Sequence, residues 1–428
     1  MDKVIKYNKT VLDNGVVIVS EENPVFYSSS IGIWLKCGSR HEKAHENGLS
    51  HFIEHMLFKG TAKRSAFDIA WQVDSIGGVL NAFTTRESTC YDIKVLSEHS
   101  ELAIDILSDL FLNSIFENSE IEKERQVILQ EIGMTLDTPD DYIHDLFYES
   151  FWGDCGLGRL VTGRSENVLS FNRNGIVDFY KKMYSPGKIV IAASGNMEHD
   201  KLVNDFSKYF NSLNRPACDW DTENIDYLPK VNVVKKKLEQ VHLSLGVPAL
   251  SCTSPDRYTL YILNTVLGEG MSSRLFQEVR EKRGLVYNIY SYVSTYEKEG
   301  LLGVYAAMSK NDLYEVIEIS MEEIRKLKEN PLTEEELRSA KAQMKSNLLL
   351  GLESSENRMH RLAVHEIIFK REISVEESIE NIESVTAEEV RLMAEKLFSH
   401  EKISMALLGD LNKREFLKRW QEIKVKLL

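Results

Sequence analysis

The sequence predicts an α+β protein in which one type of domain occurs twice. The chain has 428 residues, of which 43% are hydrophobic and 28% are charged. This composition is ordinary for a globular protein, and the chain is too long for one hydrophobic core. Strand-like and helix-like patterns follow the same order in both halves, and a helix-start signal recurs about 210 residues later. Duplication of an α+β domain explains these features most economically, and two unrelated α+β domains are the alternative.

The expected elements follow from the spacing of apolar and β-branched residues. In the first half, we expect strands at 30–36, 78–85 and 91–95, a helix at 49–59, and long helices after them. In the second half, we expect strands at 241–247, 285–291 and 303–308 and a helix at 258–266. The order of strand, helix and paired strands is therefore the same in each half.

The repeated helix-start signal is a residue that can cap a helix, followed by Glu three positions later. Ser119 and Thr333 are the two expected N-caps. A polar, acidic segment bracketed by two prolines separates the halves, and we expect it to be a linker. The predicted domains are 1–217 and 229–428, joined by the linker 218–228.

Charge and cysteine content exclude several classes of protein. The 52 Lys and Arg residues are outnumbered by 66 Asp and Glu, which gives a net charge of −14. A general nucleic-acid binder would have a basic face, so this balance favours basic or neutral partners instead. The five cysteines are scattered and contain no CxxC spacing. We expect reduced thiols, no disulfide framework and no zinc site built on thiolates.

The N-terminal region predicts a protein that is not exported. It lacks the apolar core of a signal peptide and the Arg-rich, acid-poor character of a transit peptide. No run of about 18 apolar residues occurs, so no membrane span is expected. The expected location is the cytoplasm.

The motif that carries chemistry is His51-Phe-Ile-Glu-His55. Residues four apart share one face of a helix, so the two imidazoles can converge on one metal ion, with Glu54 beside them. The arrangement is the inverse of the H-E-x-x-H motif. The rest of this helix is apolar, so its polar groups are part-buried and need a common partner. Two His and a Glu on an ordinary helix face are the alternative.

A zinc site that catalyses a reaction usually has three protein ligands and one position open to water. The best stretch for the third ligand is 122–132, where Glu124 and Glu131 lie two helical turns apart on one face. A charged helix face that is simply solvated is the alternative interpretation of this stretch.

These residues resemble the pitrilysin/insulinase metallopeptidases. The resemblance rests on the stretch 48–61 and on the 75 residues that separate His55 from Glu131. Length and duplication are similar to the mitochondrial processing peptidase branch and its bacterial relatives. The resemblance implies domains with mainly antiparallel sheets packed against helices, which form half of a clamshell. It also implies that His51, His55 and Glu131 bind one Zn²⁺ per chain, with Glu54 as general base and Glu124 as a supporting acidic residue.

This zinc site would hydrolyse peptides. Zinc lowers the pKa of a bound water toward about 7 and polarises the scissile carbonyl, while Glu54 takes the proton of the water. Protonated Glu54 then passes the proton to the leaving amine. A chamber with acidic walls would favour short, unfolded and basic peptides.

A strand edge can hold a peptide by pairing with its backbone. The segment 77–84 suits this role because two glycines allow close approach and β-prone residues follow. The segment resembles the substrate-pairing strand of the family, and an internal strand without a ligand is the alternative. The expected substrate-binding residues are Asn81, Ala82, Phe83 and Thr84.

The most distinctive stretch of the second half is 267–287. Its glycines lack the Gly-Lys-Ser/Thr of a phosphate loop. It resembles the Gly-rich loop and Arg-Tyr pair of the family, represented here by Arg280 and Tyr287. A guanidinium and a phenol can donate hydrogen bonds to a carbonyl or a developing oxyanion. A solvated Arg and a core Tyr are the alternative.

The second half has no zinc motif, and the repeat position of Glu131 falls near Lys345. In four-domain relatives, the zinc and the Arg-Tyr pair belong to different halves of one clamshell. The resemblance therefore predicts a homodimer whose active sites combine zinc from one subunit with Arg280 and Tyr287 from the other. Pairing with a non-catalytic homologue is left open.

Two other functions remain as alternatives. One is a non-catalytic assembly or binding subunit of a processing-peptidase-like complex, but a scaffold has no need of Glu54 between zinc ligands. The other is a zinc hydrolase that acts on something other than peptides, and this fits the strand at 77–84 poorly. The sequence therefore favours a zinc endopeptidase.

Overall fold

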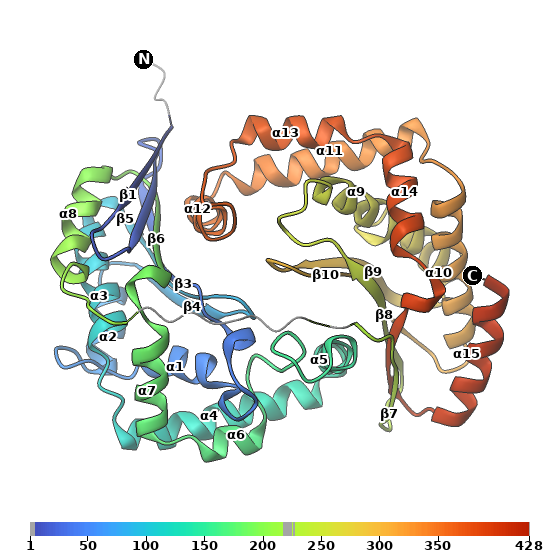
Figure 1. Ribbon diagram of the computed structural model, residues 1–428, viewed down its shortest axis with the longest axis horizontal. Coiled ribbons are helices and arrows are strands. Elements are labelled where there is room, and N and C mark those ends of the chain that lie inside the picture. The colour runs from blue at the N-terminus through green and yellow to red at the C-terminus, as the bar shows by residue number, and fades with distance from the viewer. Residues whose placement is uncertain (1–4, 217–224, 226, 428) are drawn as a thin grey trace. The chain divides into compact units, whose positions relative to one another are not determined.

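The computed structural model describes residues 5–216, 225 and 227–427, which form two compact units (Figure 1). Unit 1 takes its described residues from 1–134, 154–224 and 350–372, and unit 2 takes its own from 135–153, 225–349 and 373–428. Each unit is a sheet packed against helices, so the predicted α+β class with two domains is confirmed. The predicted linker 218–228 lies largely outside the described residues.

The sheet of unit 1 has six strands in the order β1-β2-β6-β3-β5-β4. Only the neighbours β2 and β6 run parallel, so the sheet is mainly antiparallel. β4 is an edge strand, and within the described ranges it pairs with β5 alone. The strands are β1 (Lys6–Val11), β2 (Val17–Glu22), β3 (Ser28–Leu35), β4 (Val79–Thr84), β5 (Thr89–Leu96) and β6 (Ile189–Gly195).

The sheet of unit 2 has five strands in the order β7-β11-β8-β10-β9. Here too one neighbouring pair, β7 and β11, is parallel, and all others are antiparallel. The strands are β7 (Val231–Lys235), β8 (Val241–Ala249), β9 (Val286–Thr295), β10 (Gly300–Met308) and β11 (Ser404–Gly409).

The two sheets have the same topology once β1 is set aside. In each unit, the first strand in sequence lies at one edge, the fifth lies parallel beside it, and the second, fourth and third follow antiparallel. Two unrelated domains would have no reason to share this order and these pairing senses. The two units are therefore similar domains, as predicted, and their shared order favours duplication over two unrelated domains.

Helices cover the sheets, because their apolar residues recur with helical spacing and bury one face. In unit 1 they are α1 (Leu49–Leu57), α2 (Ala66–Asp74), α3 (Ser100–Asn113), most of α4 (Asn118–Asp137), α6 (Ser165–Ser170), α7 (Arg173–Met183), α8 (His199–Phe210) and α12 (Ser355–Phe369). In unit 2 they are α5 (Pro139–Trp152), α9 (Arg257–Gly268), α10 (Leu313–Glu329), α11 (Glu334–Gly351), α13 (Val375–Ser384), α14 (Ala387–Leu397) and α15 (Lys413–Leu427). No helix in the described ranges is long and apolar enough to cross a membrane.

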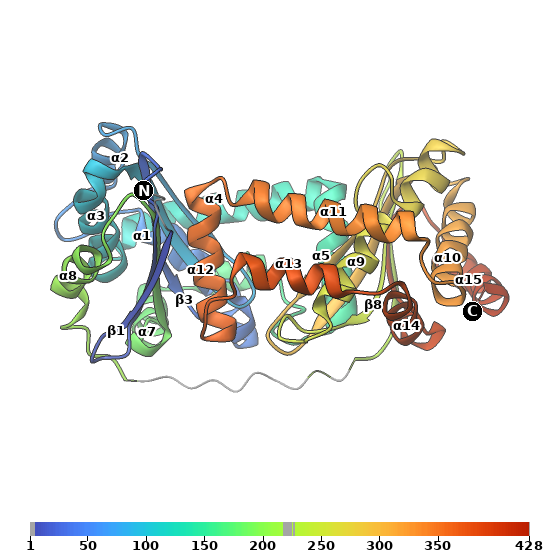
Figure 2. The same cartoon turned by 90° about the horizontal axis from the view of Figure 1, so that it is seen from above.

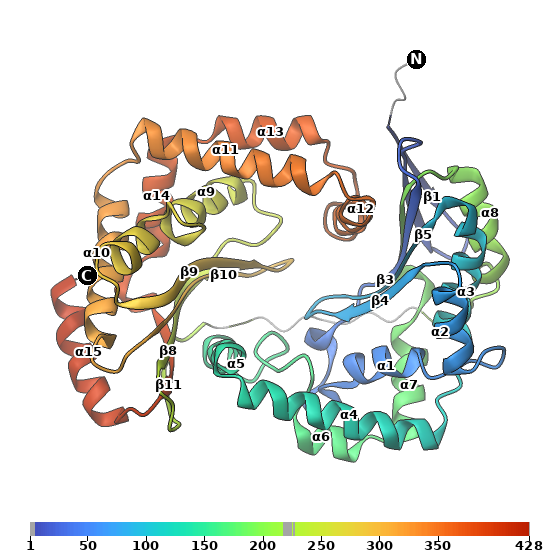
Figure 3. The same ribbon diagram turned by 180° about the vertical axis from the view of Figure 1, so that it is seen from behind.

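The two halves of the sequence exchange one helix each. α12 comes from the C-terminal half but packs against β6, β3 and β2 of unit 1 (Figure 2). α5 comes from the N-terminal half but packs against β11, β8 and β7 of unit 2 (Figure 3). The predicted domains, 1–217 and 229–428, instead keep α5 with the N-terminal half and α12 with the C-terminal half. An amphipathic pattern shows that a helix buries one face, but not which sheet receives it.

The two predicted N-caps differ in outcome. Thr333 forms a reciprocal capping box, because its hydroxyl accepts from the Glu336 N–H at 3.2 Å and the Glu336 carboxylate accepts from the Thr333 N–H at 2.9 Å. α4 begins at Asn118, so Ser119 lies inside the helix and its predicted cap is wrong. Sequence spacing alone places helix ends to within a residue or two.

Candidate metal centre

The helix α1 is held in place by a buried carboxylate from the segment just before it. Glu42 Oε2 accepts the N–H of Gly48 at 2.7 Å, and Glu42 Oε1 accepts the N–H of Ser50 at 2.6 Å. N–H groups at the start of a helix have no acceptor within the helix, so the Glu42 carboxylate supplies one. Its negative charge also interacts favourably with the positive end of the helix dipole. Burial raises the pKa of Glu42 to about 7, although these hydrogen bonds favour the charged form. Sequence reasoning missed Glu42, because no spacing rule links it to the motif.

Gly48 allows this entry into α1. Its φ of 103° is in the left-handed region that side chains rarely adopt. A Cβ at this position would also lie 2.9 Å from the Thr162 carbonyl oxygen. Gly48 therefore favours the start of α1 at this position.

The predicted ligands come together around one point. Glu131 Oε1 lies 3.7 Å from His51 Nε2, and Glu131 Oε2 lies 3.7 Å from His55 Nε2. These separations are too long for hydrogen bonds. They are close to the separation of about 3.4 Å between two atoms that share a tetrahedral zinc ion. α1 supplies the two imidazoles and α4 supplies the carboxylate.

The donor set fits a metal ion in its chemistry as well. Two imidazoles and a carboxylate are a common ligand set of zinc sites that catalyse hydrolysis, and the ligand atoms all lie within 4.8 Å of one another. Burial, together with the neighbouring His55, lowers the pKa of His51 to about 4. His51 is therefore neutral near pH 7 and keeps a lone pair for a metal.

Glu124 fixes the orientation of His55. Its Oε2 accepts from His55 Nδ1 at 3.0 Å, and its Oε1 pairs with the Lys59 ammonium at 2.7 Å. Because a carboxylate only accepts, the ring hydrogen of His55 lies on Nδ1, and Nε2 faces Glu131 with its lone pair free. A carboxylate behind a metal-binding imidazole is the usual supporting arrangement. Glu124 is buried, so the alternative of a solvated helix face does not hold for it.

Glu54 lies beside these ligands and has one strong partner. Thr84 at the end of β4 donates its hydroxyl to Glu54 Oε2 at 2.5 Å. Burial raises the pKa of Glu54, while Thr84 and the nearby His55 partly offset that effect and Glu131 adds to it. A part-buried carboxyl with a raised pKa can act as both base and acid.

The four predicted strand residues divide between the two faces of β4. Thr84 reaches Glu54, and Ala82 packs against the core that also contains α1. Phe83 lies on the other face, where its ring centroid is 5.4 Å from the ring centroid of Trp34. Asn81 is exposed. Only the outer backbone edge of β4 is common to all four.

The second predicted pair comes together within unit 2. The Arg280 guanidinium lies 5.4 Å from the ring of Tyr287, and 79% of Tyr287 is exposed. Arg280 is in a short π-helical turn, Phe276–Glu281, and such turns are frequent at functional sites. Lys345, near the repeat position of Glu131, instead pairs with Glu383 at 3.0 Å.

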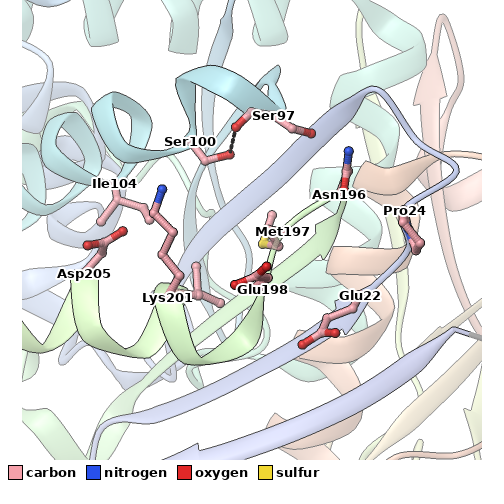
Figure 4. A pocket seen from close by; sticks show the side chains of 11 residues that line it. Glu22, Pro24, Ser97, Ser100, Ile104, Asn196, Met197, Glu198, Lys201 and Asp205 are labelled. Atoms are coloured by element: carbon pink, nitrogen blue, oxygen red, sulfur yellow. Dashed lines mark hydrogen bonds between the residues drawn. The ribbon is translucent and has the colours of Figure 1, made fainter.

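Unit 1 also has a pocket of about 420 Å³, and none of the predicted site residues lines it. Its walls come from β2, α3 and α8 (Figure 4). Two of its three acidic side chains already have partners, since Glu22 accepts from Asn8 and Asp205 pairs with Lys208. We assign this pocket no part in catalysis.

Comparison with known proteins identifies the family. Residues 17–164 match the insulinase family (peptidase family M16), and residues 170–344 match the peptidase M16 inactive domain. The chain is 41% identical over 396 residues to the "Uncharacterized zinc protease YmxG" of Bacillus subtilis, covering 92% of this chain and 96% of that protein. It is 39% identical over 415 residues to an uncharacterized zinc protease of Streptomyces coelicolor, covering 95% of this chain and 90% of that protein.

Solved structures share the fold. A protease from Helicobacter pylori has a TM-score of 0.87 at 21% identity, over 95% of this chain and 100% of that one. A peptidase M16 inactive domain from Pseudomonas fluorescens has a TM-score of 0.89 at 17% identity, over 95% and 99%. Together with the sequence matches, these findings show that the chain belongs to the insulinase family of peptidases, family M16.

Proposed function

We propose that this protein is a zinc-dependent endopeptidase that binds one Zn²⁺ per chain through His51, His55 and Glu131. The observation that carries the proposal is the convergence of three ligand atoms within 4.8 Å of one another beside the part-buried carboxyl of Glu54. The relatives named zinc proteases support both the metal and the class of substrate.

Glu54 is the proton carrier of the proposed reaction. When bound, zinc supplies a Lewis acid that polarises the scissile carbonyl and acidifies a water molecule. Glu54 accepts the proton of the attacking water and then donates it to the leaving amine. The Thr84 hydroxyl fixes Oε2 of this carboxylate, so Oε1 is the atom that takes the proton.

The free edge of β4 is the proposed binding strand for the substrate. β4 pairs with β5 on one side only, so its outer N–H and C=O groups can pair with an extended peptide. Thr84 ends β4 and contacts Glu54, so a peptide along this edge passes the proton carrier. Short or unfolded peptides offer an extended, unpaired segment most readily, and they are the proposed substrates.

We also propose that the enzyme is a homodimer with shared active sites. Arg280 and Tyr287 lie next to each other, the phenol is exposed, and both offer hydrogen-bond donors that suit a developing oxyanion. In this proposal, the pair from one subunit completes the zinc site of the other. The net charge of −14 favours basic peptides.

The proposed location is the bacterial cytoplasm. No disulfide joins the described cysteines, Cys37, Cys90, Cys155 and Cys252, and this is compatible with a reducing compartment. The relatives named above are bacterial proteins.

Metal removal tests the proposed function. The purified protein should cleave a quenched basic peptide, lose this activity after dialysis against a chelator, and regain it when Zn²⁺ is added. The cleavage products, identified by mass spectrometry, should arise from internal bonds. Cleavage that is unchanged by a chelator would exclude a zinc enzyme, and a zinc-loaded protein that cleaves no peptide would favour the binding subunit.

The substitution Glu124→Gln is expected to weaken zinc affinity about 10–100-fold, because the carboxylate that orients His55 is lost. Competition with a chromophoric chelator measures this affinity. Glu117→Gln is the matched control, since Glu117 is exposed just before the same helix. Equal affinities of the two variants would remove Glu124 from the supporting role.

A further inference from the structure

A second group of metal-binding side chains lies in unit 1, between the sheet and α12. The layer there is apolar, and α12 lies along the sheet (Figure 2). Its buried members are Val19, Trp34, Cys90, Val190, Ala192, Met359, Leu362 and Ala363. Cys90 and Asp92 of β5 and His360 of α12 bring a thiol, a carboxyl and an imidazole into this layer.

The three side chains lie close enough together to bind one metal ion. Their ligand atoms all lie within 4.8 Å of one another. Cys90 Sγ lies 3.8 Å from Asp92 Oδ2. A sulfur and an oxygen that share a tetrahedral zinc ion are about 3.6 Å apart. Residues two apart on β5 point to the same face, so the strand itself sets this spacing.

The protein groups nearby do not satisfy these side chains. Asp92 is only 3% exposed, and among the described residues the weak thiol donor of Cys90 is the one hydrogen-bond partner of its carboxylate. His360 Nε2 is buried, and no described residue forms a hydrogen bond with it. Buried polar atoms normally have partners, so the unpartnered Nε2 of His360, beside a buried carboxylate whose one described donor is a thiol, favours a bound cation.

We propose that Cys90, Asp92 and His360 bind a divalent transition-metal ion of the zinc class, separate from the centre at His51, His55 and Glu131. A thiolate with an imidazole selects zinc or cobalt over magnesium or calcium. On binding, Cys90 releases its thiol proton to solvent, and its sulfur bonds to the ion in place of hydrogen. Partly exposed His360 forms the solvent side of the site.

The surrounding packing supports this arrangement. Gly32 is the β3 partner of Asp92, and a Cβ there would lie 2.8 Å from Met359 Sδ, so the glycine lets α12 approach the sheet. The His360 ring contacts Phe83 of β4 at 5.6 Å. An ion at this site would tie α12 to β5 beside the edge strand.

Cobalt substitution tests the site, because the catalytic centre contains no thiolate. Metal-free full-length protein is titrated with Co²⁺ and followed in the near ultraviolet. We expect two Co²⁺ per chain and a thiolate-to-cobalt charge-transfer band. The band depends only on a cysteine ligand, so it reports this site whether or not the proposed peptidase activity is found.

Substitutions of single residues show which cysteine gives rise to the charge-transfer band. Cys90→Ser should remove the charge-transfer band and lower the stoichiometry from two Co²⁺ per chain to one. Cys155→Ser, the matched control, should keep the band and both Co²⁺ ions. His360→Ala should weaken the affinity of the band-forming site at least about 10-fold. A wild-type protein without the band overturns the proposal, and so does a band that survives Cys90→Ser. The spectrum of the wild-type protein shows whether a thiolate binds cobalt even if a variant fails to fold.

Discussion

Glu54→Gln is expected to lower kcat/KM for a quenched peptide about 10²–10⁴-fold while zinc stays bound. The amide has the shape of the carboxylate and still accepts the Thr84 hydroxyl, but it takes no proton from water. The measurement combines initial rates with zinc content by mass spectrometry of the same preparation.

Glu101→Gln is the matched control, because Glu101 is exposed on α3 of the same unit. It should keep wild-type rates. A Glu54→Gln protein with bound zinc and nearly full activity would exclude Glu54 as the proton carrier. A Glu54→Gln protein that loses its zinc would place Glu54 in the metal site itself, and the assigned role would be wrong.

Mixing two inactive variants is expected to restore activity if the active sites are shared. Glu54→Gln and Tyr287→Phe each disable every site in their own homodimer. In the mixed dimer, one of the two sites combines an intact Glu54 with an intact Tyr287. Random exchange makes half of the dimers mixed, so the preparation should recover about a quarter of wild-type activity.

Subunit exchange must be proven by co-purification of two different tags. A second mixture, of wild type with a chain that carries both substitutions, serves as the control. Shared sites predict about a quarter of the activity of an all-wild-type preparation, because mixed dimers are inactive, and unshared sites predict about a half. No recovery in the first mixture, despite proven exchange, would contradict the shared site.

The sequence was informative where chemistry follows from local spacing. His51, Glu54 and His55 lie on one helix, so their shared face could be inferred from their positions alone. Glu131 was harder, because acidic residues two turns apart on a helix look like a solvated face. The resemblance to the family singled it out, and the structure then placed its two oxygens opposite both imidazoles.

Contacts between distant segments could not be inferred in this way. Glu42 reaches the start of α1 from an irregular segment, and Thr84 reaches Glu54 from the end of a strand. Neither contact has a periodic signature. Cys90 and His360 are brought together only because α12 packs on the sheet of the other half of the sequence. The expectation of no thiolate site rested on CxxC spacing, which does not detect such a group.

The fold was predictable at the level of its class and its duplication, because both depend on the order of apolar patterns. Burial explains why. Strand β10, which was predicted at 303–308, is buried along its whole length, so it appears as a mainly apolar run in the sequence. The exchange of α5 and α12 depends instead on the path of the chain between units, which hydrophobic periodicity does not encode.

A zinc titration with activity as the readout tests the central claim most directly. Metal-free Cys90→Ser protein, which lacks the second proposed site, is titrated with Zn²⁺ while cleavage of the basic peptide is followed. We expect activity to rise in proportion to zinc and to saturate at one equivalent per chain, with no response in the double variant that also carries His55→Ala. Activity in the metal-free protein, or equal activity in the double variant, would contradict a zinc peptidase centred on His51, His55 and Glu131.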